Sequence, residues 1–226
     1  MSTTSTAQCV VGAMLMLSPA NADFAMAQGR QLEIGLKQEF WDGQGEWTLS
    51  AYHIRKTNLI SRDPLNPSLS VQVGERSSRG IEASLDVRLA RNWTVQANAT
   101  VLQARYDDFT ESVGGRAVSR GGNVPPNVPE RLANVWLSWN FQPAWTAMAG
   151  VRYVGKRYAD NANTLPFPSY TTTDLALRWD VGRDTTVTLR GYNVFDKAYF
   201  TTAYYNTTQW LYGAGRRVEF TLNHRF

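Results

Sequence analysis

The stretch RRVEFTLNHRF, residues 216–226, carries an alternation of apolar and polar residues to the carboxy-terminus of the chain. The apolar parity holds Val218, Phe220, Leu222 and Phe226, and the polar parity holds Glu219, Thr221, Asn223 and Arg225. His224 is the single polar residue of the apolar set. A period of two indicates a β-strand with one apolar and one polar face. The chain is therefore predicted to end in a strand rather than in the frayed polar tail that is common at domain ends.

The same alternation recurs from residue 29 onward, and no segment there has a convincing helical period. We predict nine strand-like segments: 32–40, 47–60, 71–89, 93–101, 133–139, 145–153, 174–179, 186–190 and 216–226. The alternation is weakest near residues 52–54, and 71–89 would form one strand of 19 residues. These segments predict an all-β, antiparallel fold.

Composition excludes several classes of protein. Apolar residues make up 43% and the mean hydropathy is −0.36, and the longest apolar stretch covers only residues 9–17. A transmembrane helix needs about 20 apolar residues, so helical spans are excluded, whereas a β-barrel is not. The lone Cys9 excludes an intrachain disulfide and a multi-cysteine metal site. The net charge of +4 is scattered without a Lys/Arg run of four, so no nucleic acid is expected as a partner.

The links between the segments alternate in length. Short links cover residues 41–46, 90–92, 141–144 and 181–184, and long links cover 61–68, 107–130, 160–169 and 196–215. In an up-and-down meander this order puts every short turn on one side of the sheet and every long loop on the other. That segregation is typical of an outer-membrane barrel, whereas a soluble sandwich has no reason to show it.

Tryptophans gather at the level of the short turns. Five of the eight lie within about three residues of one: Trp47, Trp93, Trp139, Trp145 and Trp179. Core tryptophans of a soluble β protein would be scattered along the strands instead. We therefore predict that these five form a membrane girdle.

Four motifs carry a resemblance to a known family: GRQLEIGLKQEF (29–40), GERSSRGIEASLD (74–86), GYNVFDKAYF (191–200) and GRRVEFTLNHRF (215–226). In order and spacing they resemble the carboxy-terminal part of the barrel of TonB-dependent outer-membrane siderophore receptors. The resemblance implies an antiparallel up-and-down transmembrane β-barrel portion, residues 29–226, with about nine strands of a barrel of about 22. It also implies a fragment that lacks the plug domain and the TonB box.

The resemblance further implies function and location. The intact protein would take up ferric siderophores in the bacterial cell outer membrane, energised through the TonB complex, and would not be an enzyme. The ferric siderophore is the transported ligand, and no cofactor is implied. Further implied partners are outer-membrane lipid and the barrel-assembly machinery, which would recognise a carboxy-terminal signal formed by Phe220, Leu222 and Phe226. The alternative that stays open is a passive porin-like or structural barrel without gated uptake.

Residues 1–28 differ from the rest and are treated as a separate, atypical segment. A polar start, a short apolar core and the small residues ANA at 20–22 resemble a signal peptide, but no Lys or Arg precedes the core. A secretory signal and an artefact of truncation both stay open for this segment.

Candidate ligand-binding residues come from the last long loop and from one arginine-containing strand. They are Tyr199, Tyr204, Tyr205, Trp210, Arg76 and Arg79. Aromatic side chains suit catecholate or hydroxamate iron complexes, and arginines could offset the charge of an anionic chelate. The alternative is that the aromatics only pack the loop or form an upper interfacial belt. No catalytic or metal-binding residue is predicted, since His53 and His224 are the only histidines and lie far apart in sequence.

Overall fold

A computed structural model gives the fold and describes residues 2–8, 24–62, 70–72, 74–204 and 209–226. In this part of the chain all regular structure is β-strand, and no helix is long and apolar enough to cross a membrane.

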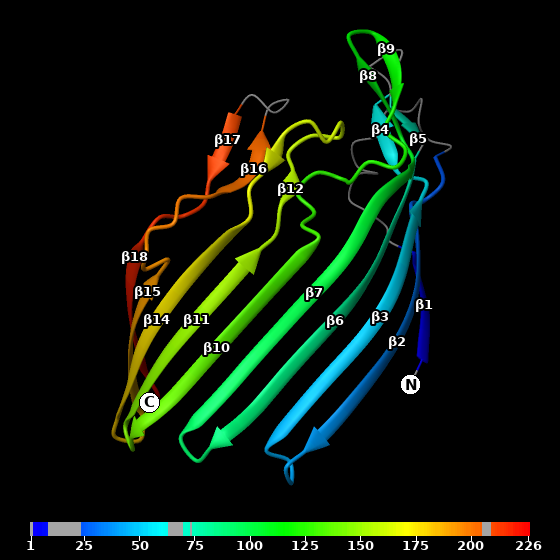
Figure 1. The fold of residues 1–226 in the computed structure, drawn as a ribbon. Helices are drawn as coiled ribbons and strands as arrows, with labels where there is room; N and C mark the ends of the chain where they lie inside the picture. Colours follow the sequence, from blue (N-terminus) through cyan, green and yellow to red (C-terminus); the bar gives the residue numbers. More distant parts are fainter. Residues whose placement is uncertain (1, 9–23, 63–69, 73, 205–208) are drawn as a thin grey trace.

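One antiparallel sheet of ten strands dominates the molecule, in the order β1-β2-β3-β6-β7-β10-β11-β14-β15-β18 (Figure 1). The strands are β1 (Ser2–Gln8), β2 (Gln28–Phe40), β3 (Gly45–Thr57), β6 (Glu75–Ala90), β7 (Trp93–Asp108), β10 (Arg131–Gln142), β11 (Trp145–Val154), β14 (Tyr170–Val181), β15 (Thr185–Tyr192) and β18 (Arg217–His224). The nine predicted segments are thus confirmed as strands of one meander. The structure adds β1, which pairs with β2 from within the segment 1–28.

The four long links carry small hairpins of their own. These are β4 (Ile60–Arg62) with β5 (Ser70–Gln72), β8 (Thr110–Val113) with β9 (Arg116–Ser119), β12 (Arg157–Tyr158) with β13 (Pro166–Phe167), and β16 (Phe200–Tyr204) with β17 (Gln209–Tyr212). All four hairpins lie at the upper end of the sheet in Figure 1, and the short turns lie at the lower end. The predicted segregation of short and long links is confirmed.

The predicted 19-residue strand at 71–89 is wrong in one respect. Residues 70–72 form β5 in a separate hairpin, and the sheet strand β6 begins only at Glu75. Gly74 lies between them with φ +117°, a conformation that L side chains rarely adopt. A Cβ atom at this position would also lie 3.2 Å from the carbonyl oxygen of Asp108. The glycine therefore allows the chain to leave one hairpin and enter the sheet.

The register joins the apolar sides of the strands into one continuous surface, called the apolar face below. Paired residues of antiparallel strands point to the same side of a sheet. One such row runs Ile34–Ala51–Ile81–Val101 from β2 to β7. On this face Ile34 is 61% exposed and Phe220 is 67% exposed. A sheet-wide exposed apolar surface of this kind marks contact with lipid or another apolar partner.

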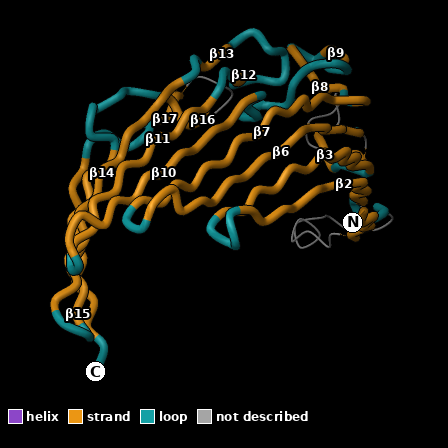
Figure 2. Tube along the Cα trace, turned by 60° about the horizontal axis from the view of Figure 1, so that its bottom comes forward, coloured by secondary structure: helices purple, strands orange, loops and turns teal. Residues whose placement is uncertain are grey.

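The opposite side of the sheet is called the polar face. It carries the other parity of each strand, for example Asn98, Asn134 and Arg152, which lie in one row across β7, β10 and β11. Figure 2 shows that the sheet is curved and open, and its edge strands β1 and β18 do not pair with each other.

Candidate functional site

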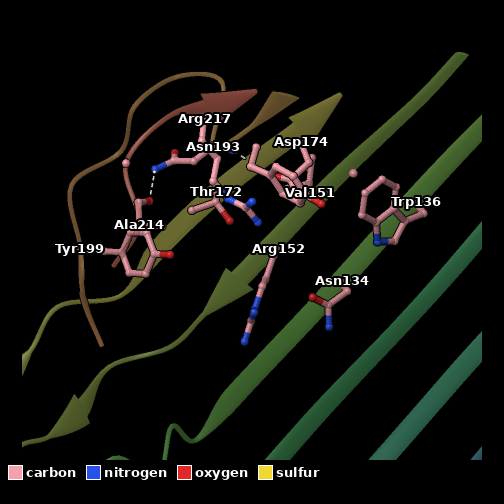
Figure 3. A pocket seen from close by; sticks show the side chains of 13 residues that line it. Asn134, Trp136, Val151, Arg152, Thr172, Asp174, Asn193, Tyr199, Ala214 and Arg217 are labelled. Atoms are coloured by element: carbon pink, nitrogen blue, oxygen red, sulfur yellow. Dashed lines mark hydrogen bonds between the residues drawn. The ribbon is translucent and has the colours of Figure 1, made fainter. Parts of the chain in front are cut away.

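A pocket of about 400 Å³ lies on the polar face, where the upper ends of β10, β11, β14, β15 and β18 meet the last long link (Figure 3). Its lining combines aromatic, basic and amide side chains with a few backbone segments. The lining residues are Asn134, Trp136, Gly150, Val151, Arg152, Thr172, Asp174, Tyr192, Asn193, Tyr199, Ala214, Gly215 and Arg217.

The floor of this pocket depends on one close approach between neighbouring strands. Trp136 of β10 pairs with Gly150 of β11, and the indole ring lies over the glycine. A Cβ atom at residue 150 would lie 2.7 Å from atoms of that ring. The glycine therefore lets the indole lie flat against the sheet, where the Arg190 guanidinium is 5.8 Å from the ring centre.

One wall of the pocket is built by the motif GYNVFDKAYF. The Asn193 side chain, which is 4% exposed, donates to the carbonyls of Lys197 and Ala214 and accepts from Lys197 N. The Asp196 carboxylate accepts a 2.8 Å hydrogen bond from Arg216 N. These side chains tie the start of the last long link to its end, which explains physically why Asn and Asp stand at these two places.

The pocket carries charges of both signs, since Arg152 and Arg217 line it together with Asp174. Arg217 lies 3.7 Å above the Tyr192 ring and 3.4 Å from Glu219. The Asp174 carboxylate accepts a hydrogen bond from Asn193 N at 2.8 Å. Arg152 forms no ion pair within the described part of the chain, and Figure 3 shows its side chain extended beside Asn134. The pocket thus presents, among the described residues, a guanidinium that forms no ion pair, together with aromatic rings and the Asp174 carboxylate.

Tyr199 forms the upper side of the pocket. Its ring stacks on Tyr170 with the centroids 4.1 Å apart. It also lies against Gly213, where an added Cβ atom would collide with the ring at 2.0 Å.

Above the pocket the long links pack into what we call the loop layer, residues 109–130, 155–169 and 193–216 without the undescribed 205–208. Its aromatic core is Phe167, which is 1% exposed and contacts the rings of Phe200 and Trp210 at 5.5 Å. Arg157, which is 4% exposed, donates from Nη2 to the carbonyls of Phe200 and Thr201. One buried arginine therefore holds the last hairpin onto the neighbouring loop.

The predicted ligand-binding residues are not brought together. Tyr199 lines the pocket, whereas Trp210 is 43% exposed and packs edge-on against Phe167 and Phe200 in the loop layer. Tyr205 lies outside the described residues, and only the backbone of Tyr204 is described.

The two predicted arginines stand on opposite sides of the sheet. Arg76 lies on the polar face of β6, which β7 separates from β10 and the pocket. Arg79 lies on the apolar face, opposite His53 and Gln103.

The pocket also contains residues that the sequence analysis did not single out: Trp136, Arg152, Tyr192 and Arg217. Strand parity could have found them, because they occupy polar-face positions near the long-link ends of their strands. The sequence analysis instead followed the high aromatic content of the last long loop, which is a more conspicuous feature than strand parity.

Four of the predicted girdle tryptophans form close pairs at the short-turn end. Trp93 stacks on Trp139 at 5.1 Å and Trp145 stacks on Trp179 at 5.2 Å, with Phe141 between the pairs. Trp47 lies opposite Leu85 on the apolar face. Phe220 and Leu222 lie on the same face of β18, and Phe226 follows the strand as a fully exposed residue. Their roles in membrane contact and assembly stay predictions. Among the described residues no group of His, Cys, Asp and Glu could hold a metal ion.

The chain is similar to known proteins over almost its whole length. A family model described as TonB dependent receptor-like, beta-barrel, matches residues 6–194. The chain is 32% identical over 211 residues to the ferrichrome outer membrane transporter/phage receptor of Escherichia coli (strain K12), covering 90% of this chain and 27% of that protein. It is also 32% identical over 181 residues to the probable TonB-dependent siderophore receptor PiuA of Acinetobacter baumannii, covering 78% of this chain and 24% of that protein.

Solved structures of siderophore receptors also resemble this fold. The crystal structure of the siderophore receptor PiuA from Acinetobacter baumannii matches with a TM-score of 0.80 at 28% identity, covering 92% of this chain and 30% of that one. That of BauA, the ferric preacinetobactin receptor of the same species, matches with a TM-score of 0.72 at 27% identity, covering 92% and 31%. The chain spans about a quarter of the length of the curated relatives it matches.

Proposed function

The chain belongs to the TonB-dependent receptors, as part of their β-barrel, and from this premise we propose that it serves in the uptake of ferric siderophores. The family consists of receptors and transporters of the bacterial outer membrane and not of enzymes. The apolar face then meets lipid and the polar face lines the barrel interior. The siderophore is cargo, and the protein needs no cofactor of its own to bind it.

The pocket on the polar face is the observation that carries this proposal. It opens beneath the loop layer and combines Tyr199 and Trp136 with the unpaired Arg152. Aromatic faces suit catecholate and hydroxamate complexes, and a guanidinium offsets the charge of an anionic chelate. A passive barrel would have no need for such a combination at the level where the interior meets the loops.

Further partners follow from the family. We propose that transport is energised by the TonB complex in the intact receptor. We also propose that the barrel-assembly machinery recognises Phe220, Leu222 and Phe226, which form an exposed apolar strand end.

Binding can be tested on purified protein in detergent with two probes, ferrichrome and a ferric tris-catecholate. We expect one of them to quench tryptophan fluorescence, since Trp136 lines the pocket. Arg152→Ala should weaken that binding about tenfold, the loss of roughly one charge-assisted contact. Arg178→Ala, on the polar face but outside the pocket, is the matched control and should leave it unchanged. If neither probe binds, or if both variants behave alike, the pocket has no such role.

Uptake of iron-55 separates gated import from the passive barrel. In cells that lack other siderophore receptors, import through an intact receptor that contains this barrel portion should stop when TonB is deleted. Import that continues without TonB would favour a porin-like wall instead.

A further inference from the structure

Two opposite charges line the pocket without pairing, those of Arg152 and Asp174. Asp174 lies opposite Gly150 across β11 and β14, so Arg152, two residues further along β11, is its diagonal neighbour on the polar face. Diagonal neighbours lie about 7–8 Å apart, a distance that long side chains can bridge. In Figure 3 the Arg152 side chain nevertheless extends beside Asn134 and away from Asp174. The two charges are thus within reach of each other but are kept apart.

The carboxylate is engaged by the backbone N–H of Asn193, the first residue after β15. This N–H donates to Asp174 Oδ1 at 2.8 Å. Within the described part of the chain no ion pair involves Asp174 or Arg152, and the neighbouring Arg217 is engaged by Glu219 at 3.4 Å. The carboxylate therefore has its partner in the last long link, and the Arg152 guanidinium is left to face the pocket.

The Asn193 side chain holds this N–H in place. Its residue has φ 45°, a conformation that few residues other than glycine, asparagine and aspartate adopt. Its Nδ2 donates to the carbonyls of Lys197 and Ala214 at 3.0 and 3.2 Å, and its Oδ1 accepts from Lys197 N at 2.9 Å. Because Asn193 is buried, these three hydrogen bonds are shielded from water. The bend at this residue, and with it the direction of the N–H, therefore depends on the asparagine side chain.

We infer that Asn193 is a positioning residue of the pocket: it keeps the Asp174 carboxylate away from Arg152 and leaves the Arg152 guanidinium free for an anionic ligand. That this ligand is a ferric chelate rests on the proposed function. Without the contact to Asn193 N, the carboxylate is free to turn to the guanidinium, and an anionic ligand then has to displace it. One residue thus sets both the closure of the last long link and the charge that the pocket presents.

The first test needs no siderophore. Phenylglyoxal modifies guanidinium groups, and mass spectrometry of the purified chain in detergent gives the rate at each arginine. Arg152 should react readily, and Arg178, which is paired with Asp180 at 2.8 Å, should react more slowly. Asp174→Asn should leave the Arg152 rate unchanged, because the carboxylate does not engage this arginine. A faster rate in Asp174→Asn would mean that the two charges already pair, and would overturn the inference.

Asn193→Gly tests the asparagine itself, since glycine adopts a φ of 45° without strain but has no side chain to fix the bend. Arg152 should then react about two- to fivefold more slowly, the effect of an exposed ion pair. The double variant Asn193→Gly with Asp174→Asn should restore the rate, a recovery that a general loosening of the loop would not produce. Ala198→Gly adds flexibility to the same link and should change nothing. An unchanged rate in Asn193→Gly, an equally slow rate in the double variant, or an equal loss in Ala198→Gly would overturn the inference.

Binding of the two iron chelates separates this inference from the proposed function. Asn193→Gly should weaken binding of the probe by the same two- to fivefold, and the double variant should restore it. If the probe binds through Arg152 but binds Asn193→Gly as tightly as the unmodified chain, the positioning role fails while the proposed function stands. If neither probe binds, the proposed function fails, and the reaction rates of Arg152 still decide whether Asn193 keeps the two charges apart.

Discussion

The sheet and the loop layer above it are stabilised by different kinds of interaction. Along β10, residues 131–139 pair one by one with β7, so backbone hydrogen bonds are the main interactions that hold neighbouring strands together. In the loop layer, single side chains take their place. Asn163 exchanges two hydrogen bonds of 2.8 Å with the backbone of Val124, and Arg157 bonds two carbonyls of the last hairpin.

This difference determines what a substitution can do in each region. In the sheet the backbone hydrogen bonds form whatever the side chain is. The effect of a substitution therefore depends on the face to which the residue points. In the loop layer the effect of a substitution depends on whether it removes a hydrogen-bonding group. A buried carbonyl or N–H that loses its partner lowers the free energy of unfolding. Neighbouring substitutions in the sheet should therefore differ by face, and neighbouring substitutions in the loop layer should differ by hydrogen bonding.

The largest effect is expected for Leu189→Arg in the sheet. Leu189 lies on the apolar face, between Leu177 and Phe220. A charge facing lipid near the middle of the band costs about 2–4 kcal/mol. Thr188→Arg, one residue away on the polar face, should cost almost nothing. Heat-modifiable gel mobility in outer-membrane extracts measures the folded fraction of each variant. Equal folded fractions for the two variants would contradict the assignment of the faces.

A somewhat smaller effect is expected for Arg157→Ala in the loop layer. The change removes the donor for the carbonyls of Phe200 and Thr201 and a cation 5.5 Å from the Phe167 ring. Hydrogen bonds that involve a charged group contribute about 1.5–3 kcal/mol. Lys156→Ala, at an exposed neighbour, is the control. Limited proteolysis should cut residues 193–216 faster in Arg157→Ala only, and the folded mobility of the sheet should not change.

The sheet could be predicted because lipid and barrel interior impose a strict period of two on the sequence. The segments from 93–101 to 186–190 show that period plainly. The alternating link lengths in addition predicted that the strands follow one another in an up-and-down meander. The break at Gly74 was missed, since GERSSRG has no feature that distinguishes a φ of +117° from extended backbone.

The candidate site was harder to predict, for a physical reason. The pocket depends on the register that puts Trp136 over Gly150 and on the contact of Asn193 with Ala214, 21 residues away. Neither is encoded in a local pattern. Tyr199 was predicted because the loop is rich in aromatics, whereas Arg152 stood in an ordinary strand. In contrast, the opposite faces of Arg76 and Arg79 follow from parity alone.

A moderate effect is expected for Asn163→Gly. Asn163 has φ 59°, which glycine adopts without strain, so the variant removes the two hydrogen bonds to Val124 together with a longer one of 3.3 Å to the carbonyl of Asp160. Two neutral hydrogen bonds contribute about 1–2 kcal/mol together. Ala162→Gly tests the added flexibility separately. Hydrogen exchange should become faster at residues 123–127 in Asn163→Gly and stay unchanged in Ala162→Gly; identical exchange would mean that the two loops are not coupled through this residue.

The smallest effect concerns pH and again separates the two regions. Burial raises the pKa of the Asp160 carboxyl, but the hydrogen bonds from Thr164 Oγ1, Leu165 N and Thr164 N outweigh it and hold the pKa below its ordinary value of 3.8. A carboxylate with a lowered pKa stabilises the fold above pH 3.8, and that stabilisation is lost as the pH falls further. Pepsin, which is active in acid, should therefore cut residues 155–169 increasingly below this pH while the sheet stays intact. Asp160→Asn cannot titrate, so its cleavage should depend on pH only through the protease itself. A parallel pH profile for the two proteins would show that the carboxylate does not hold the loop.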